Sequence, residues 1–357
     1  MLKWIEIYRK IVASNIKIIK SYLRKNVKFM AVVKANGYGH GAIEISNIAI
    51  KNGADLLGVV TAYEGAELRK SGIKSEIMIL SPSLEEEIDV IIKNKLIPTI
   101  DRLEFLYAIE KKKIPLKFNL DIDTGLKRWG IDSSLLDMYL KKIKELKYLK
   151  FYSISTHIAY TPYRNMTEAY SKLQFFSKLA QKAKSEFPDI LAHAANSLIL
   201  CDFKDFQFDM VRIGNLIYGI YPADIYKKKT KGPPLKGIKR PWKFYTKIVS
   251  IKEVKEGESF GYASEIVAVK NMKIASIPVG YSDGLTLEPQ DNSYKITEGS
   301  KYWGIINGKK APFISRSAIS NTLLDITDIP DAKVGSTVCL AIRRTAANYK
   351  IPRIYKP

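Results

Sequence analysis

The sequence predicts an α/β protein in which an N-terminal (β/α)8 barrel of the TIM type precedes a mostly β domain. Eight short apolar segments alternate with longer amphipathic ones over about 200 residues, which is the pattern of such a barrel. A doubly wound open sheet is the alternative, but no Gly-x-Gly-x-x-Gly motif follows the first apolar segment. A Lys/Gly/Pro-rich stretch then ends the alternation. We expect a barrel over residues 1–228, whose first residues can pair with the second domain, and a β domain over 229–357.

Each barrel strand is predicted from a short apolar run bounded by turn residues. The expected strands are 29–33, 56–61, 76–80, 97–100, 117–122, 151–156, 190–194 and 210–213. Helical periodicity between them predicts helices that include 62–70, 84–93, 134–144 and 166–186. In the second domain, alternating segments predict strands at 243–254, 265–269, 273–279, 301–306 and 337–342.

Composition argues against a membrane-spanning, a disulfide-rich and a metal-binding protein. The chain has 357 residues, of which 46% are hydrophobic, so it can bury more than one core. It contains no apolar run long enough to span a membrane and no apolar stretch typical of a signal peptide near Met1. Cys201 and Cys339 are far apart, and the three histidines show no paired spacing, so we expect neither a disulfide framework nor a metal site. This cysteine usage favours the cytoplasm.

The net charge of +22 raises the question of a nucleic-acid partner. The lysines are scattered singly or in short clusters, without a basic helix or a basic motif with interleaved aromatic residues. We therefore expect a lysine-rich surface that attracts anionic small molecules, and no nucleic-acid partner.

The segment around Lys34 carries the first chemical signal. Lys34 ends the first buried strand and is followed at once by the turn residues Asn36 and Gly37. A lysine at the rim of a sheet is partly desolvated, and desolvation favours the neutral amine that a Schiff base requires. The alternative is an ordinary strand-end lysine that reaches into water.

Further polar residues fall at the carboxyl ends of the predicted strands, where barrel enzymes place their chemistry. These residues are Asp121, Asp123, Arg128, His157, Asn196, Ser197, Arg212 and Gly214. Ser197 and the backbone near Gly214 suit a phosphate, because the last two loops of such barrels often bind one. Each has a structural alternative: Asp123 fits a turn, and Asn196 fits a helix N-cap. Their common placement at one end favours a site.

Taken in order, these residues resemble the fold-type III pyridoxal 5′-phosphate (PLP) enzymes, and among them the alanine racemase family. The resemblance runs from Trp4 to Tyr355. Its motifs are Val33-Lys34-Ala35-Asn36-Gly37-Tyr38-Gly39-His40-Gly41, Asp123-Thr124-Gly125 with Arg128, Thr156-His157, His193-Ala194-Ala195-Asn196-Ser197, Val211-Arg212-Ile213-Gly214, Ser259-Phe260-Gly261-Tyr262-Ala263, Pro278-Val279-Gly280-Tyr281-Ser282-Asp283-Gly284 and Tyr349-Lys350-Ile351-Pro352-Arg353-Ile354-Tyr355.

The resemblance implies that Lys34 binds PLP covalently and serves as one of two proton-transfer bases. Tyr262 is implied as the other base, supplied by the partner subunit of a homodimer. His157, with Arg212 behind it, is implied to activate that tyrosine. Arg212 would also contact the pyridine nitrogen and, because arginine holds its proton, leave that nitrogen unprotonated. Such a ring is a limited electron sink, which suits racemisation.

The remaining roles concern the cofactor phosphate and the substrate. The implied cofactor-binding residues besides Lys34 and Arg212 are Tyr38, Asn196, Ser197, Gly214, Asn215 and Tyr349. The implied substrate-side residues are Arg128, Ile319 and Tyr281, with Tyr281 and Tyr349 at a narrow entrance.

Three departures from the family pattern bear on the substrate side. Asp121 stands where many members have a carbamylated lysine, and we expect its carboxylate to orient Arg128 by an ion pair. The loop that usually ends in Met-Asp has Ile319-Ser320-Asn321. The segment 340–349 is shorter than usual. Tyr262, rather than Phe260, is assigned as the base from its distance to Tyr281.

The sequence therefore predicts a cytoplasmic, homodimeric, PLP-dependent racemase of L- and D-alanine, which would supply D-alanine for peptidoglycan, with no nucleic-acid or membrane partner. One alternative is a racemase of another or several amino acids. A second is a non-catalytic PLP-binding protein, which the β domain at 240–357 disfavours.

Overall fold

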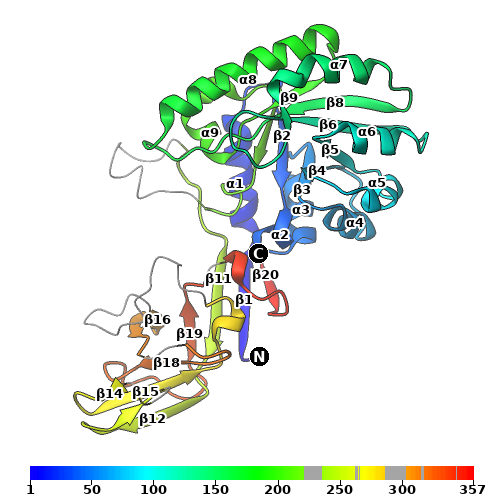
Figure 1. The fold of residues 1–357 in the computed structure, drawn as a ribbon. Coiled ribbons are helices and arrows are strands. Elements are labelled where there is room, and N and C mark those ends of the chain that lie inside the picture. Colours follow the sequence, from blue (N-terminus) through cyan, green and yellow to red (C-terminus); the bar gives the residue numbers. More distant parts are fainter. Residues whose placement is uncertain (221–234, 262–263, 265, 286–302, 315–316, 343) are drawn as a thin grey trace. The chain divides into compact units, whose positions relative to one another are not determined.

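The computed structural model describes residues 1–220, 235–261, 264, 266–285, 303–314, 317–342 and 344–357. They divide into two compact units, one of residues 10–240 and one of residues 1–9 with 241–357 (Figure 1). The boundary at Arg240 and Pro241 follows the Lys/Gly/Pro-rich stretch, whose residues 221–234 lie outside the described part. No helix in the described part is long and apolar enough to cross a bilayer.

Residues 10–240 form a nearly closed barrel of eight parallel strands, as the sequence predicted. Their order around the barrel is β10-β2-β3-β4-β5-β6-β8-β9. Their bounds are β2 (Lys28–Val32), β3 (Leu56–Val59), β4 (Glu76–Pro82), β5 (Ile97–Ile100), β6 (Leu116–Asp123), β8 (Leu149–Ser155), β9 (Leu191–His193) and β10 (Met210–Ile213). The short β7 (Ile131–Asp132) pairs with β6. Each predicted barrel strand matches one of these within a few residues.

The barrel closes between β9 and β10, the two ends of this strand order, through backbone hydrogen bonds of β9 and of the loop that follows it. The Asp209 amide donates to the Ala192 carbonyl at 3.1 Å, and the Arg212 amide donates to the Ala195 carbonyl at 2.8 Å. On its other side, β10 pairs with β2 from Met210 to Ile213. This closure brings Arg212 and the Asn196-Ser197 loop to the same end of the barrel as Lys34.

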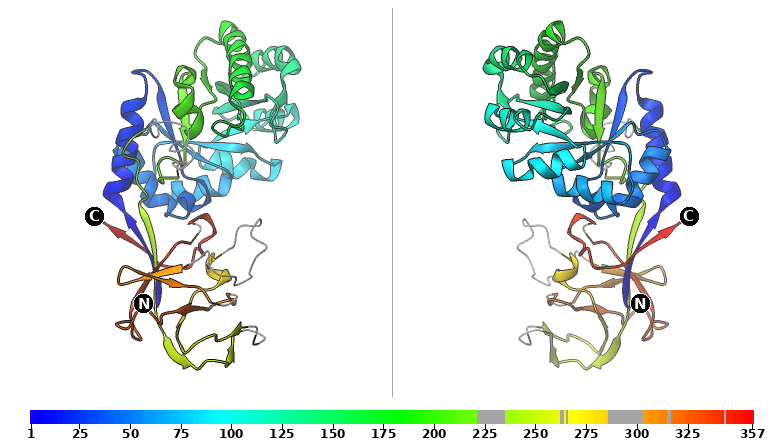
Figure 2. Two further views of the ribbon diagram at one scale, coloured as in Figure 1. Left: turned by 90° about the vertical axis from the view of Figure 1, so that its left-hand side faces the viewer. Right: turned by 90° about the vertical axis from the view of Figure 1, so that its right-hand side faces the viewer.

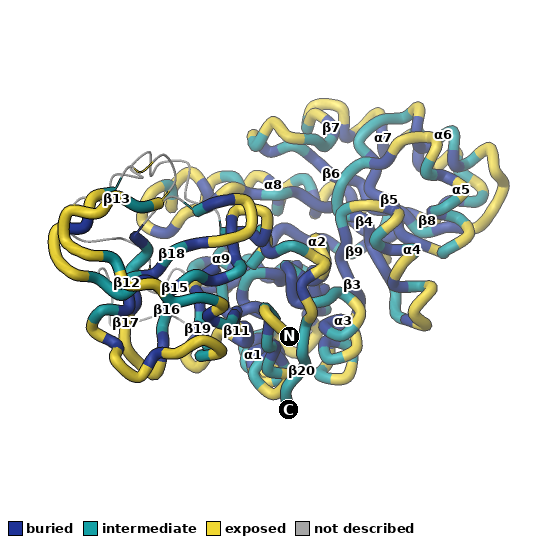
Figure 3. The backbone as a smooth tube through the Cα atoms, turned by 90° about the horizontal axis from the view of Figure 1, so that it is seen from below, coloured by how far each residue is buried: buried dark blue, intermediate teal, exposed yellow. Residues whose placement is uncertain are grey.

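Helices cover the outside of the ring of strands (Figures 1 and 2). They are α1 (Arg9–Tyr22), α2 (Lys34–Tyr38), α3 (Ala42–Lys51), α4 (Ala62–Lys70), α5 (Ile88–Lys93), α6 (Leu103–Glu110), α7 (Leu136–Lys144), α8 (Met166–Glu186) and α9 (Ser197–Asp202), with 3-10 turns η1 (Glu85–Glu87), η2 (Ser133–Leu135) and η3 (Lys204–Phe206). The barrel strands are mostly buried, as their dark blue segments in Figure 3 show. Burial along a whole strand is expected where helices cover the outside of a barrel and side chains fill its inside. The barrel core includes Met30, Leu56 and Met78.

The other unit is built of β-sheets. A six-stranded sheet has the order β17 (Lys309–Pro312), β16 (Trp303–Ile306), β19 (Thr337–Leu340), β11 (Trp242–Lys247), β1 (Lys3–Tyr8) and β20 (Arg353–Lys356). A second sheet has β12 (Ser250–Val254), β15 (Met272–Ile277) and β18 (Thr322–Asp325), and β13 (Ser259–Phe260) pairs with β14 (Ile266–Val267). Two 3-10 turns, η5 (Tyr281–Asp283) and η6 (Arg344–Ala346), lie in its loops. This unit is mostly β, as predicted.

One expected strand of the β unit is divided in the structure. The expected strand 243–254 is two strands, because the chain leaves one sheet after Lys247 and enters the other at Ser250. At this crossing the Ile248 amide donates to the Ser336 carbonyl, and the Val249 amide donates to the Ser276 carbonyl. The N-terminal β1 lies between β11 and β20, so the chain's first residues pair with the β unit, a pairing that the sequence prediction included.

Candidate active site

The chain takes an unusual path immediately after the first barrel strand. Strand β2 ends at Val32, so Lys34 opens the following turn instead of ending the strand. Residues 35–38 all have positive φ values, between 50° and 61°, which makes a single left-handed helical turn. The Gly37 amide donates to the Val33 carbonyl at 2.8 Å, and the Gly39 amide donates to the Ala35 carbonyl at 3.0 Å. Non-glycine residues adopt this conformation only where surrounding contacts hold it.

Glu64 supplies part of that support. Its carboxylate accepts the Ala35 amide at 2.7 Å and the Val60 amide at 2.8 Å, and so joins the turn after Lys34 to the end of β3. It also closes a capping box with Thr61 at the start of α4. Glu64 was not among the predicted site residues. The Thr61-x-x-Glu64 spacing after a predicted strand indicates a capping box, and it is the sequence feature that points to Glu64.

One cavity of about 400 Å³ lies at the carboxyl ends of the barrel strands. It is lined by the nine barrel residues to which the sequence assigned catalytic or binding roles: Lys34, Tyr38, Arg128, His157, Asn196, Ser197, Arg212, Gly214 and Asn215. Asp121 and Asp123, also predicted at this end of the barrel, are not among its lining residues. Its volume suits a small cofactor with its substrate. Tyr281, Ile319 and Tyr349 belong to the other unit, and Tyr262 lies outside the described residues.

Lys34 contributes a primary amine to this cavity. Burial lowers the pKa of Lys34, and the positive charges of Arg128 and Arg212 lower it further, while Glu64 opposes them. The two neighbouring guanidinium groups and burial destabilise the protonated amine. The pKa of Lys34 is therefore lowered in the direction that the desolvation argument predicted.

His157 and Arg212 lie on neighbouring parts of the cavity wall. Burial lowers the pKa of His157 to about 3, and the nearby Arg212 and Arg128 add to this shift, so the imidazole is neutral at ordinary pH. Burial lowers the pKa of Arg212 to about 10, which leaves it a cation. The Arg212 guanidinium donates to the Thr156 carbonyl, next to His157 in the chain. A neutral imidazole can donate one hydrogen bond and accept another, but it carries no positive charge.

The cavity has a second cluster of groups suited to a phosphate. The Tyr38 ring stacks on Tyr218 with 4.6 Å between ring centroids, and a Cβ added at Gly214 would lie 2.5 Å from the Tyr38 hydroxyl oxygen. Glycine therefore permits the hydroxyl to approach the backbone at this point. Burial raises the pKa of Tyr38 to about 12, so the hydroxyl keeps its proton and can donate it. The Ser197 hydroxyl accepts the Leu216 amide at 3.4 Å, which leaves its own proton free for a ligand.

Asn196 and Asp123 have the structural roles, helix N-cap and turn residue, that the sequence offered as alternatives to a functional role. Asn196 caps α9, because its side-chain oxygen accepts the Leu198 amide at 3.0 Å and the Ile199 amide at 3.1 Å. Asp123 stabilises a turn through the Gly125 amide at 2.8 Å. Asn196 still lines the cavity, so capping and ligand contact are compatible there.

The predicted ion pair between Asp121 and Arg128 is wrong. No ion pair within 4 Å joins the two side chains in the described part of the chain; Asp121 instead accepts a hydrogen bond from Ser155, inside the barrel. The aspartate side chain is short and buried, whereas Arg128 is exposed and stacks on Trp129, 3.7 Å from the ring centroid. Arg128 and Asp121 interact electrostatically without contact.

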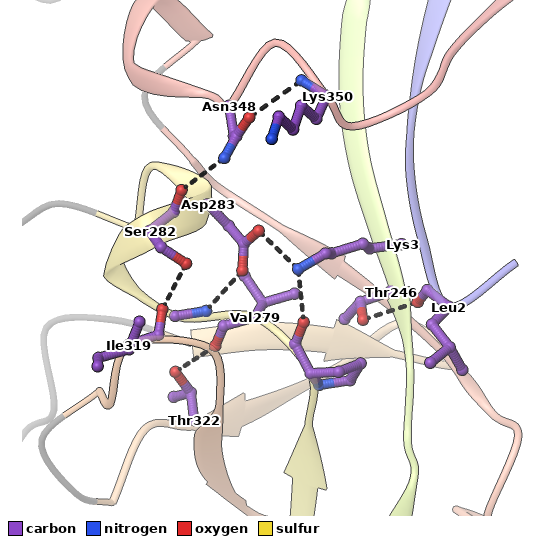
Figure 4. Close-up of polar contacts among 12 residues, drawn as sticks. Leu2, Lys3, Thr246, Val279, Ser282, Asp283, Ile319, Thr322, Asn348 and Lys350 are labelled. Atoms are coloured by element: carbon purple, nitrogen blue, oxygen red, sulfur yellow. Dashed lines mark hydrogen bonds and ion pairs between the residues drawn. The ribbon is translucent and has the colours of Figure 1, made fainter.

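Three predicted site residues belong to the β unit: Tyr281 and Ile319 from the substrate side, and Tyr349 from the cofactor-binding set and the entrance. Figure 4 shows the contacts of Ser282, Ile319 and Asn348 that connect their loops. The Ile319 carbonyl accepts the Ser282 amide at 3.0 Å, directly after Tyr281. The Asn348 side chain donates to the Ser282 carbonyl at 3.1 Å, directly before Tyr349. All three side chains are exposed on this unit. The β unit therefore presents Tyr281, Ile319 and Tyr349 together.

Comparisons with known proteins show the family of this chain. The family model described as the alanine racemase N-terminal domain matches residues 7–222, and the C-terminal domain model matches residues 242–354. An alanine racemase of Halothermothrix orenii is 32% identical over 94% of this chain and 86% of its own length. One of Methanococcus maripaludis is 32% identical over 94% and 87%.

Solved structures show the same fold. The alanine racemase of Clostridium difficile 630 superposes with a TM-score of 0.87 at 26% identity, covering 100% of this chain and 96% of that one. The structure of a Bacillus anthracis alanine racemase with bound L-Ala-P has a TM-score of 0.85 at 25% identity, covering 99% and 95%.

Proposed function

This chain belongs to the alanine racemase family, and from that premise we propose that it interconverts L- and D-alanine with PLP as its cofactor. The observation that carries the proposal is the convergence of nine sequence-predicted residues on one cavity, with a lysine of lowered pKa among them. The proposed biological role is to supply D-alanine for peptidoglycan in the cytoplasm.

The residues present fit PLP. Gly214 leaves room for the Tyr38 hydroxyl, and Ser197 has a free proton, so this end of the cavity offers donors for a phosphate. Lys34 offers an amine for covalent attachment, and Arg212 offers a cation that does not give up its proton. The chemistry that PLP supplies when bound is to withdraw electrons from the substrate's Cα and acidify its C–H bond.

The protein's own part is to hold and move the proton. We assign the two bases to Lys34 and Tyr262, on opposite faces of the substrate, with Tyr262 supplied by the partner subunit of a homodimer. Lys34 is suited to accept a proton at Nζ because burial and neighbouring cations favour its neutral form. His157, which is neutral, is proposed to hold the tyrosine oxygen by a hydrogen bond.

Substrate orientation is assigned to Arg128 and to the loop with Ile319. Arg128 is exposed at the cavity wall and is suited to a carboxylate. The Ile319 carbonyl is used within the β unit, whereas its amide has no acceptor among the described residues, which supports the proposed contact of that amide with the substrate carboxylate. Tyr281 and Tyr349 are assigned to a narrow entrance.

Turnover of several amino acids is the second candidate. It is favoured by Ile319-Ser320-Asn321, whose side chains replace the usual Met-Asp in an exposed loop. A non-catalytic PLP-binding role is disfavoured because the C-terminal domain model also matches this chain.

The test is a purified protein incubated with PLP. We expect a visible absorption band that Lys34→Ala removes, and exchange of the Cα hydrogen of L-alanine for solvent deuterium. A panel of other L-amino acids measures the breadth of substrates. Bound PLP without exchange into any amino acid would refute racemase activity and leave a binding role.

A further inference from the structure

The first strand of the chain reaches a buried carboxylate in the loops that present Tyr281, Ile319 and Tyr349. The Lys3 ammonium lies 2.6 Å from Asp283 Oδ1 and donates to the Pro278 carbonyl at 3.2 Å (Figure 4). The Asp283 side chain is only 4% exposed, whereas that of Lys3 is 30% exposed. A buried carboxylate needs partners, and Lys3 supplies the one positive charge within 4 Å of it in the described part of the chain.

Asp283 is a junction of the entrance loops. Its Oδ2 accepts the Gly280 amide at 3.0 Å, which closes the turn that contains Tyr281. Its carbonyl accepts the Asn348 amide at 3.3 Å, next to Tyr349. The neighbouring Ser282 donates through its amide and hydroxyl to the Ile319 carbonyl, at 3.0 and 2.7 Å. Asp283 and Ser282 thus connect all three loops.

The packing around this junction leaves little freedom. A Cβ added at Gly280 would lie 2.2 Å from the Ala318 carbonyl oxygen, and one added at Gly284 would lie 2.4 Å from the Ala346 carbonyl oxygen. The three loops are therefore in backbone contact on both sides of Asp283. Lys3 belongs to β1, which is hydrogen-bonded to β11 and β20, so the junction is anchored to a rigid sheet.

We propose that Lys3 and Asp283 are a positioning pair that holds the substrate entrance in its binding geometry, so that the ion pair governs substrate affinity more than the chemical step. The inference rests on the proposed function, because it takes Tyr281, Ile319 and Tyr349 as the substrate side. Lys3 and Asp283 touch neither cofactor nor substrate in this scheme. They act through the backbone of the three loops.

Lys3→Met tests the pair while keeping the length of the side chain. We expect KM for L-alanine to rise about tenfold with kcat changed less than about threefold, because the reacting groups on the barrel are untouched. Lys3→Arg, which keeps the charge, should restore most of the affinity. Lys20→Met is the control for loss of a lysine ion pair, since Lys20 pairs with the more exposed Asp55 (3.1 Å) within the barrel unit. It should leave KM unchanged.

Hydrogen exchange gives a readout independent of activity. In Lys3→Met, the amides of Gly280, Ser282 and Asn348 should exchange at least about tenfold faster, while barrel amides keep their rates. Lys20→Met should not accelerate these three. Asp283→Asn combined with Lys3→Met should show less than the sum of the single effects on KM, because both remove the same contact.

The outcomes separate the two proposals. An inactive wild type with normal loop exchange refutes the proposed function. Faster exchange of the three amides with an unchanged KM, or an equal effect of Lys3→Met and Lys20→Met on KM, overturns the positioning role. A fall in kcat alone overturns it as well.

Discussion

Ser155 donates a hydrogen bond to the buried carboxylate of Asp121, beneath the cavity that contains Lys34 and Arg212. The Asn119 side chain in turn donates to the Ser155 hydroxyl at 2.8 Å, and its oxygen lies 3.1 Å from His193 Nε2. The barrel therefore contains a buried hydrogen-bonded polar network in addition to the apolar cluster that includes Met30, Leu56 and Met78. Burial raises the pKa of Asp121 to about 7, although Arg212, the Ser155 bond and Arg128 all oppose the rise.

Asp121 makes folding stability depend on pH in a defined direction. The unfolded carboxyl ionises near pH 4, whereas the folded one ionises near pH 7. Between these values the folded state binds the additional proton, so its free energy of unfolding falls as pH rises from 4 to 7 and is level above. The loss at pH 8 is on the order of 4 kcal/mol.

Asp121→Asn should remove this dependence. The amide resembles the protonated acid and can still accept the Ser155 hydrogen bond. Chemical denaturation at pH 5 and at pH 8 should show a stability gain relative to wild type that is larger at pH 8. Asp137→Asn, at an exposed carboxylate, is the control. Parallel pH profiles for wild type and Asp121→Asn would contradict the raised pKa.

Tyr38→Phe should weaken PLP binding without unfolding the barrel. The hydroxyl next to Gly214 is lost, while the stack on Tyr218 remains. Loss of one hydrogen bond to an anion is worth about 1.5–3 kcal/mol, which corresponds to at least about a tenfold rise in Kd. Absorbance titration of apo-protein with PLP measures this. The exposed Tyr63→Phe should bind as wild type does; an unchanged Kd for Tyr38→Phe would exclude its hydroxyl from the phosphate site.

Glu64→Gln should lower the pKa of the Lys34 amine further. The carboxylate of Glu64 opposes the effect of burial on Lys34, and the amide has no charge to do so. Labelling of Lys34 in apo-protein by an amine reagent, followed by mass spectrometry, should therefore reach its half-maximal rate at a lower pH than in wild type. Glu67→Gln, on the same helix, should not shift the profile. A shift to higher pH would mean that the turn after Lys34, rather than charge, dominates.

The sequence predicted the barrel because buried parallel strands leave a strong local pattern of apolar runs and turns. It also predicted which side chains meet in the cavity, because the carboxyl ends of all eight strands share one end of the barrel. It did not predict the left-handed turn at Ala35–Tyr38, since only Gly37 among these residues favours positive φ. It also placed Asp121 beside Arg128, because spacing along the chain says nothing of whether a side chain turns into the barrel or out of it.

The β unit was harder to predict. Strand β1 has an alternating pattern in Trp4-Ile5-Glu6-Ile7, but its partners β11 and β20 are more than 230 residues away in sequence, as the Trp4–Tyr245 pairing shows. The Lys3–Asp283 contact depends on that distant pairing, so no local sequence pattern predicts it.

Tyr262→Phe tests the assignment of the second base, which lies outside the described residues and stays a prediction. If Tyr262 and Lys34 serve opposite faces of the substrate, this change should abolish deuterium exchange into one enantiomer of alanine while exchange into the other, through Lys34, survives. PLP absorbance should be unchanged, because the phosphate donors and Lys34 lie on the barrel. Tyr245→Phe, in β11, is the control for the loss of one hydroxyl in the β unit. Near-normal racemisation by Tyr262→Phe would reassign the base, since phenylalanine has no group that can carry the proton.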